Sequence, residues 1–272
     1  MLKRLFFLLC ASTILAQPPI VFEVDSLGFS PGSRISITYP SIFRTNSNAK
    51  VSATVGGKPA YILGHNPLGI DAQIPFELEA GATTLIVTVD GTQLAPFNLR
   101  LETFAPGIAS CTGDSRCDFG SFLNFNGRFI GPQTPAVPGD PLLAAATGLG
   151  PTNPPTATGP APSTRATANP VTLTIAGKAA EVTFAGLGVS AIGDYSLNFK
   201  VSAGVQGTQP LTVTVGGKTS APVNIPLFGI GSIVSNASFG SRGIAAPGSI
   251  VSVFANGLGF INQLTGFPAI NF

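Results

Sequence analysis

Apolar and polar residues alternate over short stretches along most of the chain, which is the period of a half-buried β-strand. The clearest stretches are four alternating runs that each end in a turn containing glycine: Val51–Lys58 (VSATVGGK), Leu85–Gly91 (LIVTVDG), Val171–Lys178 (VTLTIAGK) and Leu211–Lys218 (LTVTVGGK). Paired glycines permit the positive φ angles of the primed turns that close tight β-hairpins. The pattern therefore predicts a repeat protein of short strands and hairpins.

The same order of strands and turns occurs twice, in residues 18–103 and in residues 104–227. Pro-Gly turns begin at Pro31, Pro138 and Pro247, which lie 107 and 109 residues apart. About seven short strands in each region are typical of an immunoglobulin-like sandwich. We therefore expect an all-β protein with tandem immunoglobulin-like β-sandwiches at 18–103 and 104–227. An incomplete third repeat at 228–272 is expected to supply too few strands for a sandwich of its own.

Composition agrees with this fold class and narrows the function. Charged residues make up 10% of the chain and apolar residues 44%, with 33 Gly and 24 Pro, which excludes a coiled coil and a charged disordered chain. The formal net charge is +2, so there is no basic field that would attract nucleic acid. We expect no nucleic-acid partner.

Residues 1–16 have the pattern of a secretory signal peptide. Lys3 and Arg4 form a basic start, an apolar run follows, and Ala16 places a small residue before the cleavage point. One alternative is a buried N-terminal strand or helix. A lipoprotein signal fits less well, because such signals have a small residue directly before the cysteine and here Leu9 precedes Cys10. No later stretch is apolar for long enough to span a bilayer. We expect the mature protein to be secreted or held at the cell surface.

The two cysteines left after signal removal are Cys111 and Cys117, separated by the turn-like sequence Thr-Gly-Asp-Ser-Arg. In an oxidising compartment an even pair at this spacing predicts a local disulfide. Because the closed loop is short, it would stabilise the fold by only about 2 kcal/mol on the loop-entropy model. A metal site is the alternative, but two thiols without a nearby His fall short of four ligands.

Two stretches interrupt the strand pattern. Residues 151–170 carry six Pro and five Thr, which predicts an extended, mobile loop inside the second sandwich. We interpret it as a tolerated surface insertion, with a glycosylated or partner-binding loop as the alternative. The other stretch contains Asn126-Gly127, which indicates a β-hairpin. Its aromatic side chains are expected in the core or between domains rather than on a ligand platform: Phe119, Phe122, Phe125 and Phe129.

The sequence contains no catalytic constellation. His65 is the single histidine, and we expect it to be a surface residue of a loop between strands. There is no Gly-x-Ser-x-Gly elbow, and no Cys–His pair can be assembled. Asp114 and Asp118 flank Cys117, but a calcium site needs six or more oxygen ligands. We expect no enzyme activity, no cofactor and no metal.

Repeated polar residues have a structural interpretation. Asp71 and Asp194 occupy equivalent places before an alternating strand, which predicts a shared structural role, such as accepting backbone amides at a strand entry. Lys58, Lys178 and Lys218 follow the turn glycines. We interpret these lysines as solvated turn residues, and the alternative is that they bind acidic polysaccharide.

The order of motifs resembles a paralogous domain of acidobacterial secreted proteins, which usually forms the C-terminal region of long exported chains. The resemblance covers most of residues 20–227 and rests on GIDAQIPFE, DGTQLAPF, VTLTIAGKAAEVTFAGL and GDYSLNFKV. SNASFGSRGIAAPGSIVSVFANGLGF looks like the opening of a further copy, and ending there suggests a truncated gene, a fragment or a degenerate cap. The halves are similar to bacterial Ig-like and IPT/TIG modules. The resemblance implies a β-sandwich fold and no catalytic motif.

These patterns predict an exported, non-catalytic structural or adhesion-type module at the cell surface or outside the cell. A cell-surface protein or a polysaccharide fits as a partner class. The alternative is a carbohydrate-binding accessory module of an exported enzyme system, which exposed planar aromatics would indicate. The absence of Trp, with only Tyr39, Tyr61 and Tyr195 as tyrosines, counts against that alternative. A hydrolase on this scaffold lacks a nucleophile and a base.

Overall fold

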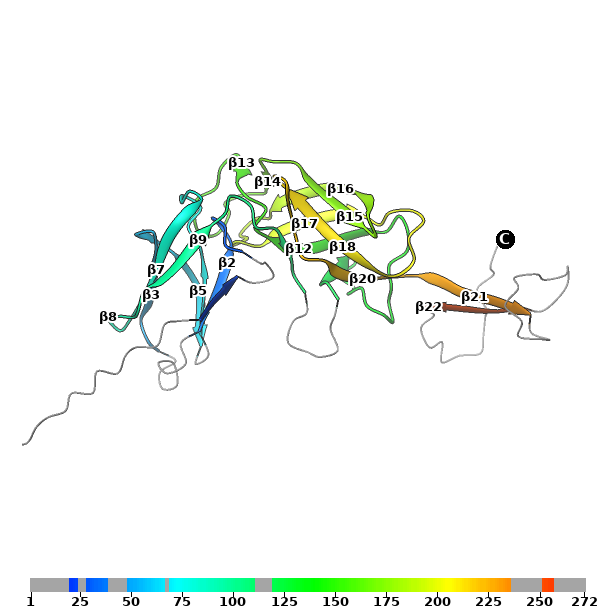
Figure 1. The fold of residues 1–272 in the computed structure, drawn as a ribbon, viewed down its shortest axis with the longest axis horizontal. Coiled ribbons are helices and arrows are strands. Elements are labelled where there is room, and N and C mark those ends of the chain that lie inside the picture. Colours follow the sequence, from blue (N-terminus) through cyan, green and yellow to red (C-terminus); the bar gives the residue numbers. More distant parts are fainter. Residues whose placement is uncertain are drawn as a thin grey trace, which may run out of the picture.

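The computed structural model describes residues 20–23, 28–38, 48–66, 69–110, 119–235 and 251–256, in which every regular element is a β-strand (Figure 1). The all-β prediction is confirmed. The predicted signal peptide at 1–16, both cysteines of the predicted disulfide, and Asp114 and Asp118 lie outside the described residues. No helix of the described part is long and apolar enough to cross a membrane.

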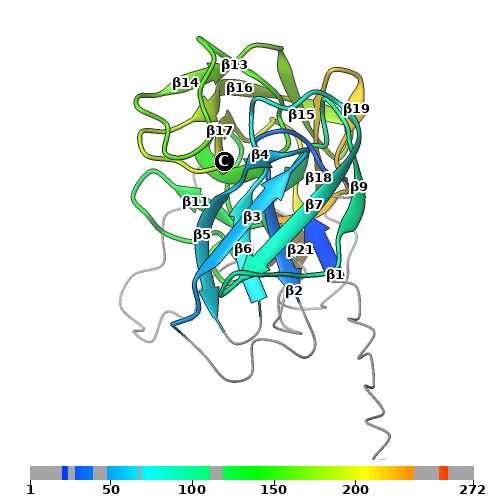
Figure 2. The same ribbon diagram turned by 90° about the vertical axis from the view of Figure 1, so that its left-hand side faces the viewer.

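The first sandwich consists of two antiparallel sheets, which Figure 2 shows one in front of the other. One sheet has the order β1-β2-β6-β5. Its strands are β1 (Ile20–Glu23), β2 (Arg34–Thr38), β6 (Gly69–Gln73) and β5 (Tyr61–Asn66). In the other sheet β7 pairs with β3, β8 and β9. Its strands are β4 (Lys58–Pro59), β3 (Val51–Val55), β7 (Gly81–Val89), β8 (Thr92–Gln93) and β9 (Phe97–Leu101).

The second sandwich uses the same plan with added strands. Its first layer contains β10 (Gly107–Ile108), β11 (Phe122–Asn124), β12 (Pro141–Thr147), β17 (Tyr195–Lys200), β13 (Thr152–Asn153) and β14 (Arg165–Thr167). Its second layer contains β15 (Val171–Ile175), β18 (Gly207–Val215), β19 (Lys218–Thr219) and β20 (Val223–Leu227). The long β16 (Lys178–Leu187) joins the layers, because it pairs first with β15 and then with β17.

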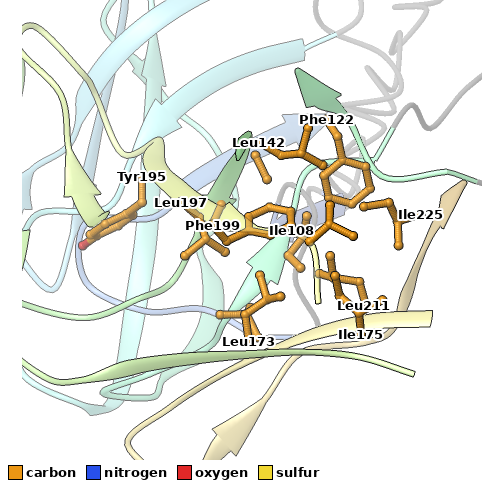
Figure 3. Packing of buried hydrophobic residues seen from close by; sticks show 14 of the residues in the cluster. Ile108, Phe122, Leu142, Leu173, Ile175, Tyr195, Leu197, Phe199, Leu211 and Ile225 are labelled. Carbon is orange, nitrogen blue, oxygen red and sulfur yellow. The ribbon is translucent and has the colours of Figure 1, made fainter. Parts of the chain in front are cut away.

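Each sandwich has its own hydrophobic core, because alternate side chains of both layers point inward. The core of the first contains buried residues from Ile35 to Leu101, and the core of the second contains residues from Ile108 to Leu227. In the second core the rings of Phe122 and Phe199 meet edge to face, with centroids 6.1 Å apart (Figure 3).

The four glycine turns have the geometry that the sequence predicts. Both central residues of each turn have positive φ: Gly56 and Gly57, Asp90 and Gly91, Ala176 and Gly177, Gly216 and Gly217. Positive φ at both positions defines the type I′ turn, whose twist matches that of the flanking strands. The prediction of primed hairpin turns is confirmed.

The third repeat is represented by β21 (Gly229–Ser235) and β22 (Val251–Asn256), which pair with each other in a separate two-stranded sheet. β21 begins two residues after β20 ends, and β22 lies downstream of Pro247-Gly248 as β2 and β12 lie downstream of their own Pro-Gly turns. Pro247 itself lies outside the described residues.

Candidate functional site at the junction of the two sandwiches

The junction between the sandwiches is organised around Gln73, a fully buried polar residue at the end of β6. Its side-chain Nε2 donates to the carbonyl oxygen of Gly32 at 3.2 Å, within the first sandwich. Its Oε1 accepts from the backbone N–H of Gly159 in the second sandwich, at 2.8 Å. These bonds tie Gln73 to both sandwiches at once. Losing either bond would leave a buried amide group without a partner, which is costly.

Glu77 and Thr158 form a second polar contact across the junction. The hydroxyl of Thr158 donates to one carboxylate oxygen of Glu77 at 2.5 Å, and the Thr158 N–H donates to the other at 3.0 Å. The same hydroxyl oxygen accepts from the N–H of Phe76 at 2.9 Å. Partial burial raises the pKa of Glu77, but the Thr158 hydrogen bonds, with a smaller contribution from the Lys58 ammonium, outweigh it and bring that pKa below its ordinary value.

Two phenylalanines supply the apolar part of the junction. Phe76 follows β6 in the first sandwich, yet it packs against the core of the second, and its ring covers Gly32 so closely that a Cβ there would lie 2.0 Å from it. Phe104, in the connection between the sandwiches, also packs against the second core and covers Gly150 and Gly216. Only glycine fits beneath these rings, because any side chain would occupy the same space.

An ion pair and a close backbone approach complete the contact. The Arg34 Nη1 donates to the Asp194 carboxylate at 2.9 Å, and both side chains are partly exposed, so the pair contributes little by itself. Beside it, a Cβ on Gly193 would lie 2.7 Å from the carbonyl oxygen of Gly32. The backbones of the two sandwiches therefore meet directly at this point.

The proline-rich segment 151–170 has a different role from the one its composition predicts. It contributes β13 and β14, and β14 pairs with β16 through Arg165 and Ala166. Its central residues Thr158 and Gly159 contact the first sandwich, and Ala161 is buried in the second core. The expectation of an extended, mobile insertion is wrong for this structure, because strand pairing and the junction contacts hold both sides of the segment.

Shallow hollows flank the junction. One is lined by Lys58, Pro59, Ala60, Tyr61, Glu77 and Thr158. Its charged groups already have partners, since Lys58 Nζ donates to the Glu77 carbonyl oxygen at 2.5 Å and the Glu77 carboxylate accepts from Thr158. Of these contacts, the Glu77–Thr158 bonds link the two sandwiches, whereas the Lys58 bond lies within the first.

The predicted equivalence of Asp71 and Asp194 is corrected by the strand register. Both sandwiches have a β-bulge at the same place, between Ile62 and Gly64 in β5 and between Val182 and Phe184 in β16. After the bulge Asp71 pairs with Gly64 and Asn198 pairs with Phe184, so Asp71 corresponds to Asn198. Asp71 accepts from the Ser36 hydroxyl at 2.5 Å inside its own sandwich, whereas Asp194 reaches Arg34 across the junction. Sequence order alone hid the difference.

The three turn lysines stand at hairpin ends as predicted, but each has a partner. Lys58 and Lys178 make equivalent hydrogen bonds in the two sandwiches. Lys178 Nζ donates to the Gly204 carbonyl oxygen at 2.8 Å, and Lys58 Nζ donates to the Glu77 carbonyl oxygen. Lys218 lies 3.7 Å from the carboxylate of Glu102. Their interpretation as merely solvated residues is therefore incomplete.

The remaining candidate residues separate into buried and exposed ones. His65 lies within β5 rather than in a loop, and its buried Nδ1 has no hydrogen-bond partner among the described residues. Tyr195 is buried, which raises its pKa, and its hydroxyl donates to the Gly150 carbonyl oxygen. Tyr61 is exposed beside Gly159, and Tyr39 lies outside the described residues.

The four phenylalanines of residues 119–129 differ in how far they are buried. The turn N–H of Gly127 donates to the Asn124 carbonyl oxygen at 2.9 Å, which confirms the predicted hairpin. Phe122 lies in the core, as expected, and the backbone of Phe119 forms a bridge with Asn224. Phe125 and Phe129 are exposed, so the expectation of buried packing is wrong for these two.

No group of three or more metal-ligating side chains occurs in the described part of the chain. The loop that carries Cys111 and Cys117 is closed at its base by an antiparallel bridge between Ser110 and Gly120. The disulfide itself stays a prediction, because both cysteines lie outside the described residues.

The residues of the junction were not recognisable as a group from the sequence. Gln73 reads as one more polar position in an alternating strand, and Thr158 as one threonine of a proline-rich loop. No signal in the sequence marks Gln73, because it falls at a polar position of the alternation, and only the structure shows that this position is buried.

Neither a protein-family model nor a curated protein sequence matches this chain. Among solved structures, it is similar to the surface glycan-binding protein SGBP-B of a Bacteroides ovatus mixed-linkage glucan utilization locus, determined with a heptasaccharide. That match has 12% identity and a TM-score of 0.33, and covers 76% of this chain and 44% of that one. The glycan-binding protein PbSGBP-B of Prevotella bryantii matches with 9% identity and a TM-score of 0.25, over 76% of this chain and 41% of that one.

Domains 5–6 of the S-layer protein SbsC match with 13% identity and a TM-score of 0.29, over 77% of this chain and 98% of that one. This chain spans less than half the length of the two glycan-binding proteins. At these identities the likeness concerns chain architecture and does not extend to ligand or activity.

Proposed function

We propose that this protein is an exported, non-catalytic spacer module of the cell surface or extracellular space, in which two immunoglobulin-like sandwiches are held in one fixed orientation. Its family would be the acidobacterial paralogous domain that the sequence resembles. The observation that carries the spacer function is the junction: the buried Gln73 is hydrogen-bonded within one sandwich and to the other.

The junction has the mixture of contacts that a fixed orientation requires. Phe76 and Phe104 pack against the second core, and the Glu77–Thr158 and Gln73–Gly159 hydrogen bonds define the angle between the sandwiches. Contacts between tandem domains otherwise permit relative motion unless the interface is packed and apolar. The described polar side chains of this region are used for contact between sandwiches, which fits a mechanical role better than catalysis.

The test is ¹⁵N relaxation of the mature protein by NMR. If the junction is fixed, amides of β7 and β18 report one common rotational diffusion tensor. A Glu77→Gln/Thr158→Val variant weakens the junction and separates the two tensors. Thr167→Val is the matched control, because its hydroxyl donates to Asn169 within the second sandwich and not across the junction. Independent tumbling of the sandwiches in the wild-type protein would overturn the proposal.

The second candidate is a carbohydrate-binding accessory module, and one observation favours it. Tyr61, Phe125 and Phe129 are exposed aromatic side chains, which are the groups that stack on sugar rings. A glycan array with the mature protein decides between the two functions. Saturable binding that is lost in a Tyr61→Ala or a Phe125→Ala variant would replace the spacer proposal with this one.

A further inference from the structure

Exposed apolar side chains occur at the end of the second sandwich that faces away from the junction. Among the described residues, Phe125 is 63% exposed, Phe129 64% and Val137 40%. Asn124 pairs with Leu142 at the beginning of β12, so the turn after β11 extends beyond that strand. Val137 belongs to the Pro-Gly turn that precedes the same strand. We call these three residues the distal patch.

The chain leaves the second sandwich at this same end. The backbone of Ala136 forms a bridge with Leu227, the last residue of β20, and the Phe228 N–H donates to the Ala136 carbonyl oxygen at 2.7 Å. β21 starts at the next residue, Gly229 (Figure 1). The distal patch therefore lies beside the point from which the third repeat begins.

The corresponding end of the first sandwich is covered by the second sandwich. There the Pro-Gly turn at Gly32 and the loop after β6 meet the second sandwich through Phe76. The Gly32 N–H donates to Ile74 as the Gly139 N–H donates to Val201, so Ile74 corresponds to Val201. Two residues further along the chain, the position of Phe76 is occupied by Ala203 in the second sandwich. The apolar surface at the second end comes instead from the added hairpin.

We propose that Phe125, Phe129 and Val137 are the docking surface for the repeat that begins with β21 and β22. This inference rests on the proposed spacer function, because it adds a second junction of the same kind. The repeat is covalently attached, with only Phe228 between β20 and β21, so its effective concentration at the patch exceeds that of any free partner. Exposed apolar surface of this kind indicates a site of protein contact.

The test is hydrogen–deuterium exchange of the full mature chain, read at Gly229–Ser235 and Val251–Asn256. A Phe125→Ser/Phe129→Ser variant is expected to accelerate exchange in both segments by at least about tenfold, because local opening follows the loss of packing. Val189→Ser is the matched control, since Val189 is 66% exposed and lies outside the patch. An unchanged melting temperature of the two sandwiches shows that the variant is folded.

The outcomes are distinguishable from one another. Unchanged exchange at β21 and β22 overturns the docking surface, and leaves the first junction to be judged by its own relaxation experiment. A concentration-dependent dimer that the double variant abolishes also overturns it and assigns the patch to a second copy. Saturable glycan binding lost in the double variant overturns it in favour of a sugar platform.

Discussion

The first and second sandwiches share one strand plan, and what differs between them is concentrated in two segments of the second. Both have a Pro-Gly turn before the first long strand, a bulge opposite the same strand and a lysine that binds the facing loop. Within the part of the chain that the structure describes, the hairpin of residues 119–129 and the segment 151–170 occur only in the second. The hairpin contributes Phe122 to the second core, and the segment 151–170 contacts the first sandwich through Thr158 and Gly159.

The core shows what the first addition does. Phe199 pairs with Val182 where Ala72 pairs with Ile62, so an aromatic ring replaces a methyl group at corresponding positions. Phe122 of the added hairpin packs edge to face against that ring. The larger core therefore depends on a contact that the first sandwich does not have.

The largest effect is expected for Phe199→Ala, which makes this position resemble the first sandwich. Loss of the buried ring leaves a cavity beside Phe122 and should lower the free energy of unfolding of the second sandwich by about 4 kcal/mol. Calorimetry checks this, because each sandwich has its own core and is expected to contribute its own transition. An equal shift in the unfolding of the first sandwich would contradict the assignment of separate cores.

The closing hairpins differ in what their turns tolerate. The first has Asp90 at φ 49° and the second has Gly216 at φ 54°, where a Cβ would lie 2.3 Å from the Phe104 ring. Gly216→Asp therefore combines backbone strain with overpacking, and should cost about 3 kcal/mol in chemical denaturation. The reciprocal Asp90→Gly change removes only the bond from the Lys50 N–H and should cost about 1 kcal/mol or less. Equal losses would show that Phe104 does not cover the turn.

At the junction, Thr158→Val removes the hydroxyl bond to the Glu77 carboxylate and the bond that this hydroxyl accepts from the Phe76 N–H. This loss should lower the free energy of unfolding by about 1–2 kcal/mol. The pKa of Glu77 is lowered in the folded state, so the ionised carboxylate stabilises the fold. This stabilisation is complete above the ordinary pKa of 4.5 and is lost as the pH falls through the lowered pKa. The variant should therefore show a weaker pH dependence in the acid range. NMR titration of the Glu77 side chain measures this, and an unchanged pKa in the variant would rule out Thr158 as its cause.

The smallest effect is expected at the middle hairpins, where Ala176 at φ 51° stands in the place of Gly56. Ala176→Gly relieves left-handed strain but gives the unfolded chain more freedom, so the net gain should be about 0.5 kcal/mol or less. Gly56→Ala should have the opposite sign, because its Cβ would lie 2.8 Å from the Thr83 hydroxyl oxygen. Thermal unfolding of both variants checks the pair, and a loss of stability in Ala176→Gly would contradict the strain argument.

Local patterns determined the strands and turns of this protein. Alternation over Val51–Val55 and Leu211–Val215, with glycines after each, was enough to predict hairpins and their primed turns. This succeeds because side-chain period and positive φ are properties of neighbouring residues. The repeated Pro-Gly spacing likewise predicted a tandem β architecture, since each copy needs the same inward-facing positions.

Only the tertiary structure decided which residues face one another across the junction. Gln73 and Gly159 are 86 positions apart, and Arg34 and Asp194 are 160 apart. The strand register separated Asp71 from Asp194, and strand pairing turned a proline-rich segment into part of the interface. Such contacts depend on how two completed cores pack against each other, which no local pattern encodes.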